Sequence, residues 1–141
     1  MRSAGVAIVL ALSLAPLAGT AVARDALIGV WRGTSICTNR EAAPACVDEQ
    51  VVYDIRATPG KAEEITVKAD RIVNGRREAM GDLAFHLDAT TGRWVTEIQT
   101  PRLHALWYLS LANGVLGGGL TLLPSTTQVR KIELRRAQGS E

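Results

Sequence analysis

Few side chains in this sequence stand in the patterns that catalysis requires. A hydrolase needs a nucleophile beside a positioned base, and the chain contains no Gly-x-Ser-x-Gly motif. The two histidines, His86 and His104, each lie outside any motif that includes an acidic orienting residue. Glu63 and Glu64 are adjacent, so in a strand they would face opposite sides and could not act as one acid–base pair. We therefore predict no catalytic residue and expect a protein that is not an enzyme.

Residues that could hold a phosphate, a metal ion or a nucleic acid are also sparse. The glycine run at 117–119 lacks the lysine and the helix start of a phosphate-binding loop, and is more typical of a bulge or bend in a strand. The two cysteines lie far in sequence from both histidines, so spacing does not suggest a metal site. The formal net charge is only +2 at pH 7 and the charges are interspersed. We expect no cofactor, no metal ion and no nucleic-acid partner.

The N-terminal residues have the pattern of a secretory signal peptide. Arg2 is their only charged residue, an apolar run covers residues 4–18, and Ala21-Val22-Ala23 is a small-x-small cleavage site. The apolar run is shorter than a membrane span requires. We therefore predict a signal peptide over residues 1–23, a single domain over residues 24–141, and export to the periplasm or the medium.

The two cysteines of the chain are expected to form a disulfide. In an exported protein an even number of cysteines is typical of disulfides, so we predict a bond between Cys37 and Cys46. Their spacing is too wide for a Cys-x-x-Cys redox motif. The bond would close a short loop that contains Pro44, and the chain-entropy model gives it roughly 2.5–3 kcal/mol of stabilisation.

The hydrophobic pattern of residues 24–141 has a period of two, which is typical of strands with one buried and one solvated face. Turn-forming pairs such as Asn74-Gly75 and Asn113-Gly114 fall between these segments and favour tight hairpins. Sequential antiparallel strands of this number can close an up-and-down meander into a barrel, so we predict an all-β, eight-stranded antiparallel barrel. The predicted strands cover residues 29–37, 48–56, 63–73, 77–87, 93–99, 103–111, 115–123 and 127–136.

The stretch from Leu103 to Val129 differs from the other strands because it contains no formally charged residue at neutral pH. A transmembrane helix is the alternative for this stretch, but Asn113-Gly114 and the glycine run favour a hairpin. As a hairpin the segment is apolar on both faces, with Leu106 and Tyr108 on the side opposite the core. We therefore predict no membrane span in the domain, and expect other residues or a partner to cover that outer face.

The first and last predicted strands resemble those of the calycins, the superfamily of lipocalins, fatty-acid-binding proteins and avidins. Gly29-Val30-Trp31 matches the Gly-x-Trp that opens the first calycin strand, and the last strand contains Val129-Arg130-Lys131-Ile132-Glu133-Leu134. In lipocalins a cationic residue of the last strand packs across that tryptophan and closes one end of the barrel. The resemblance therefore implies that Trp31 and Arg130 form a barrel-closing cation–π pair.

The resemblance has a narrower part and clear limits. The stretch from Gly29 to Ile55 is similar to small exported bacterial proteins of lipocalin-like appearance, a group to which no activity is attached. The central lipocalin motifs and the biotin-binding pattern of the avidins are absent from the chain. The resemblance thus implies a fold and contributes little about function.

Two functions from different classes are compatible with this reading. The first is a carrier of a small apolar ligand, for which the interior aromatic residues Tyr53, Phe85, Trp94 and Trp107 are the candidate lining. The alternative is a protein-binding module such as a periplasmic protease inhibitor, which would bind through the loop at 37–46 or the outer face near Tyr108. The oligomeric state does not follow from the sequence.

Overall fold

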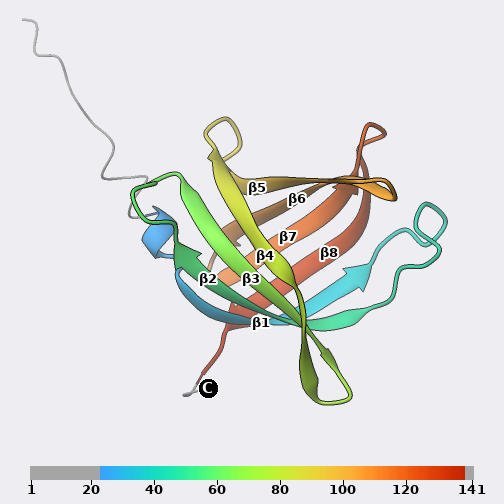
Figure 1. The fold of residues 1–141 in the computed structure, drawn as a ribbon, viewed down its shortest axis with the longest axis horizontal. Coiled ribbons are helices and arrows are strands. Elements are labelled where there is room, and N and C mark those ends of the chain that lie inside the picture. Colours follow the sequence, from blue (N-terminus) through green and yellow to red (C-terminus); the bar gives the residue numbers. More distant parts are fainter. Residues whose placement is uncertain (1–22, 139–141) are drawn as a thin grey trace, which may run out of the picture.

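The computed structural model describes residues 23–138 and consists of a single closed β-barrel (Figure 1). Every strand pairs antiparallel with the next one in sequence, and the last returns to pair with the first, which is the predicted up-and-down topology. The predicted signal peptide lies, apart from Ala23, outside the described residues. The strands are β1 (Gly29–Cys37), β2 (Glu49–Ala57), β3 (Glu64–Val73), β4 (Arg76–Asp88), β5 (Arg93–Thr100), β6 (Leu103–Ala112), β7 (Val115–Leu122) and β8 (Thr127–Arg136).

Local turn chemistry explains why the strand limits agree closely with the prediction. Asn74 and Asn113 adopt positive φ angles of 51° and 54°, and the glycine after each adopts 75°. Two successive residues with positive φ make the tight hairpin turn whose twist matches that of the flanking strands. These two hairpins set the registers of β3–β4 and β6–β7, and thereby the face on which each side chain lies.

One end of the barrel, here called the closed end, is sealed by residues that precede β1. Leu27 is buried, and its carbonyl accepts a hydrogen bond of 2.8 Å from the Trp31 Nε1–H. The guanidinium of Arg136 lies 4.5 Å from the centre of the Trp31 ring, and it also donates to the carbonyls of Ile28 and Ala26. The opposite end carries the loop at residues 38–48 and is called the open end (Figure 1).

The cation over Trp31 is therefore Arg136, and the prediction of Arg130 was wrong. In the β1–β8 register Trp31 pairs with Arg136, whereas Arg130 pairs with Cys37 at the open end. At about 3.3 Å per residue, the two arginines are roughly 20 Å apart along β8. Both lie on the inward face of the strand, so alternation identified the face correctly but not the end of the barrel.

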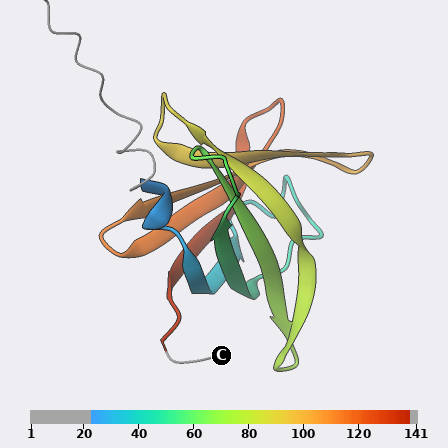
Figure 2. The ribbon, with the colours of Figure 1, turned by 60° about the vertical axis from the view of Figure 1, so that its left-hand side comes forward.

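Strands β4 and β5 are joined only near the closed end. Their register contains three pairs, from Asp88↔Arg93 to His86↔Val95, whereas β5 and β6 share seven. Beyond His86 the two strands diverge toward the open end, as Figures 1 and 2 show. Within the described residues, β4 residues 76–85 therefore pair with β3 alone and β5 residues 96–100 with β6 alone.

The apolar stretch forms the hairpin β6–β7, and contacts within the molecule cover its outer face at Tyr108. Tyr108 lies across Gly119, where a Cβ atom would come within 2.9 Å of the tyrosine hydroxyl. The guanidinium of Arg93 sits 4.4 Å above the centre of the Tyr108 ring. Glycine in this run is thus required for close packing of an aromatic ring, and a register shift follows directly after it between Leu120 and Thr121.

Nowhere in residues 23–138 is there a helical segment with the length and apolar character needed to cross a bilayer.

Candidate ligand cavity at the open end

The barrel interior is hollow toward the open end, where a cavity of about 210 Å³ remains. Toward the closed end the interior is filled by buried side chains such as Trp31, Phe85 and Leu134. Alternation along the strands directs the lining residues inward, and most of them are apolar. The lining consists of Ser35, Glu49, Val51, Tyr53, Met80, Ile98, Trp107, Leu120, Arg130 and Ile132.

Two of the four aromatic residues expected to line a ligand site lie in the cavity wall. These are Tyr53 and Trp107, whose ring centres are 5.5 Å apart in an edge-to-face arrangement. Phe85 packs behind Trp107, again edge-to-face at 5.5 Å, and is fully buried. Trp94 is buried beside the closed end, where it pairs with Leu87 and Leu109. Neither Phe85 nor Trp94 is part of the cavity lining, because close packing fills the barrel at their level.

Met80 is the lining residue that the sequence pattern could not place. It is the extra residue of a β-bulge, since Ala69 pairs with Gly81 and Asp70 pairs with Ala79. The bulge turns the Met80 side chain toward the cavity and leaves it 41% exposed. A two-residue alternation of side chains does not reveal such an insertion in β4. The same alternation does predict the inward positions of Ile98 and Leu120.

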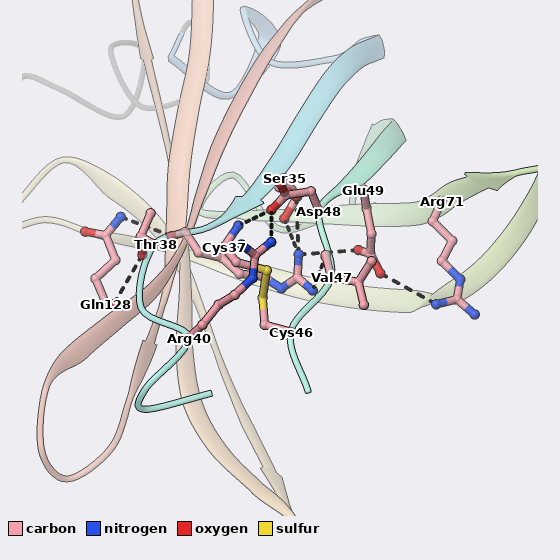
Figure 3. The surroundings of a disulfide bond; sticks show 11 residues. Ser35, Cys37, Thr38, Arg40, Cys46, Val47, Asp48, Glu49, Arg71 and Gln128 are labelled. Carbon is pink, nitrogen blue, oxygen red and sulfur yellow. Dashed lines mark hydrogen bonds and ion pairs between the residues drawn. A yellow bond between two sulfur atoms is a disulfide. The ribbon is translucent and has the colours of Figure 1, made fainter. Parts of the chain in front are cut away.

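A row of alternating charges crosses one side of the open end. Glu49 lies between two arginines, with Oε2 3.6 Å from Arg130 Nη1 and Oε1 3.5 Å from Arg71 Nη1. Arg71 Nη2 also lies 3.0 Å from Glu78 Oε2. Figure 3 shows the contact between Arg71 and Glu49. The side chains of Glu49 and Arg130 are each 18% exposed. Since the row holds two positive and two negative groups, it gives the open end a polar rim without a net charge.

Arg130 connects this rim to the disulfide-linked loop. Cys37 and Cys46 form the predicted disulfide (Figure 3). Arg130 Nη1 donates to the carbonyl and the hydroxyl of Ser35 at 3.3 and 3.1 Å, and Nη2 donates to the carbonyl of Val47 at 3.0 Å. Ser35 lies on β1 and Val47 lies near the end of the loop, so Arg130 ties the end of the loop to the barrel.

The loop itself is ordered by local hydrogen bonds. The Cys37 N–H donates to Asp48 Oδ1 at 2.7 Å, and Arg40 lies 3.3 Å from the same oxygen. The Ala42 N–H donates at 2.9 Å to Oδ1 of Asn39, three residues earlier, in the manner of an N-cap side chain. The residues between the cysteines therefore fold into compact turns and do not form an extended segment.

The Tyr53 hydroxyl in the cavity wall stays uncharged, chiefly because it is buried. Burial raises the pKa of the Tyr53 hydroxyl far above its ordinary value; nearby Glu49 raises it further, and Arg130 lowers it. Tyr53 is therefore neutral throughout the physiological range. The Trp107 Nε1–H is buried without a hydrogen-bond acceptor among the described residues, and two aromatic rings pack edge-to-face with its indole. Aromatic faces are weak acceptors for such a group.

Within residues 23–138 there is no group of three or more histidine, cysteine, aspartate or glutamate side chains that could hold a metal ion. The chain matches no protein-family model and no curated protein.

Proposed function

We propose that the protein is an exported, calycin-like carrier that binds a small, largely apolar molecule in the cavity at the open end. The observation that carries this proposal is an apolar cavity of about 210 Å³ inside a closed barrel, bordered by Met80 and the charged rim. Ligand sites in barrels commonly combine an apolar wall with a few polar groups at the mouth. The eight-stranded barrel and the disulfide are consistent with such a carrier.

The cavity volume limits the size of the ligand. An apolar protein cavity of about 150 Å³ accommodates benzene, so one of about 210 Å³ fits a molecule of one or two fused rings or a short acyl chain. A long-chain fatty acid would exceed the volume of the cavity, because side chains fill the interior toward the closed end. A polar group of the ligand would lie at the mouth, near Ser35 and Arg130, while its apolar part contacts Leu120 and Ile98.

A cavity-filling variant tests the proposal against a matched control. Leu120 lines the cavity, whereas its neighbour Thr121 belongs to the same strand and faces outward. We expect the purified protein to bind a two-ring fluorophore such as 2-naphthol saturably. Leu120→Trp should abolish that binding, and Thr121→Trp should leave it intact. Absence of saturable binding to the parent protein, or equal loss in both variants, would contradict a ligand site in this cavity.

The alternative function, protease inhibition, has less structural support. The loop at 38–48 contains turns, whereas a substrate-like inhibitor presents an extended segment. The outer face near Tyr108 is occupied by Arg93. Val47, at 65% exposure, is the apolar residue of the loop that a protein partner could contact. Recovery of a stoichiometric protein partner through this loop, lost on Val47→Ser, would favour the alternative.

A further inference from the structure

The divergence of β4 and β5 leaves two strand edges without partners beside the cavity. These edge segments, β4 residues 82–85 and β5 residues 96–100, are here called the seam. Within the described residues, neither segment pairs across the seam, although His86↔Val95 marks where pairing stops. The unpaired backbone N–H and C=O groups of such edges are templates for an added strand.

The inner side of the seam is apolar. Met80 and Ile98 border the cavity from the two sides, one on β4 and one on β5. Leu83 also faces inward, because it alternates with Asp82 and is packed against the core cluster. A strand placed in the seam would therefore direct every second side chain toward these groups.

The outer side of the seam has one carboxylate on each edge segment, Asp82, which lies opposite Lys68 of β3, and Glu97. Asp82 is exposed on β4, and the Glu97 side chain is 54% exposed on β5, where it contacts His104. Neither edge segment contains a lysine or an arginine. The outward side chains of an added strand would thus face carboxylates on both sides, which favours basic residues at these positions.

We infer that the seam binds an extended peptide in which apolar and basic residues alternate. The peptide inserts between the two edges and pairs with β5 residues 96–100, where the strand is regular, while β4 covers its other edge. β5 is the main template because β4 carries a bulge at Met80, and bulges weaken edge pairing. The recognition mode is strand addition, with main-chain hydrogen bonds for affinity and alternate side chains for selectivity.

The geometry of the seam defines the peptide further. Five residues of β5 at about 3.3 Å each span roughly 17 Å, so a peptide of about seven residues covers the segment. Because β4 and β5 are antiparallel, the inserted strand runs parallel to one and antiparallel to the other. This site adds a peptide-binding activity that does not depend on a small-molecule ligand, although the two would compete where Ile98 and Met80 border the cavity.

Amide exchange in the intact, oxidised protein tests this inference. The probe is an acetylated heptapeptide of alternating lysine and valine with lysine at both ends. We expect it to slow hydrogen exchange at residues 96–100 about tenfold, because those amides and their neighbours become part of a paired sheet. The same peptide with N-methyl groups on its valines should not do so, since it lacks three of its seven backbone N–H donors, all on one edge of the strand.

Charge-swap variants provide the second arm. The double variant Asp82→Lys, Glu97→Lys should bind the basic peptide about fivefold more weakly at low salt and instead bind the glutamate–valine analogue. Glu133→Lys, an exposed reversal on the outer face of β8, should leave both affinities unchanged. Binding that leaves residues 96–100 unprotected, no binding up to millimolar peptide, or equal binding of the N-methylated peptide would overturn the inference. So would protection that depends on protein concentration alone, because a second copy would then occupy the seam.

Discussion

Replacement of Arg136 by methionine should destabilise the closed end of the barrel by about 2 kcal/mol. Arg136 covers the Trp31 ring at 4.5 Å and donates to the Ile28 and Ala26 carbonyls. A cation–π contact at a largely exposed site contributes about 0.5–1 kcal/mol. Each hydrogen bond adds roughly 0.5–1 kcal/mol net, discounted here because the arginine is exposed. Methionine retains the apolar stem over the indole, so the loss of unfolding free energy measures the contribution of the guanidinium.

Urea unfolding followed by far-ultraviolet circular dichroism measures this change, provided the m-value stays constant. Arg136→Lys should lose about half as much, because a lysine keeps the cation but not the two-carbonyl fork. Arg135→Met is the matched control, since Arg135 is the exposed neighbour on the opposite face, and it should change stability by less than about 0.5 kcal/mol. The reasoning would be refuted if Arg136→Met were as mild as the control, or if Arg130→Met were the variant that altered the near-ultraviolet signal of Trp31.

Two further predictions concern the disulfide and the buried tyrosine. Replacement of both Cys37 and Cys46 by serine should cost roughly 2.5–3 kcal/mol of unfolding free energy while the barrel still folds, which calorimetry at constant pH can measure. The pKa of Tyr53 is raised in the folded state, so its contribution to stability is complete below its unfolded pKa near 10 and is lost as pH rises beyond that value. Stability should then fall by up to about 1.4 kcal/mol per pH unit from this residue, and Tyr53→Phe should remove that component; an unchanged alkaline slope in the variant would contradict the assignment.

Most of the local architecture was accessible from the sequence. The alternation of apolar residues predicted most of the strands, and Asn74-Gly75 and Asn113-Gly114 located two of the hairpins, because pleat and turn geometry depend on neighbouring residues. The disulfide followed from two cysteines at a loop-closing distance in sequence. Tyr53 and Trp107 were identified as interior residues for the same reason of alternation.

The positions of the site residues along the barrel axis required the tertiary structure. The two-residue period of a strand shows which face of the sheet a side chain occupies. It contains no information on which residue of a distant strand lies opposite. Trp31 therefore meets Arg136 and not Arg130, through the long-range register of β1 with β8. The Met80 bulge and the early separation of β4 from β5 likewise arise from closing the sheet, since curvature and stagger belong to the barrel as a whole. Sequence alone thus determined the strands, their turns and the disulfide; only the closed barrel decided where its interior is filled, where it is hollow and where its edges stay unpaired.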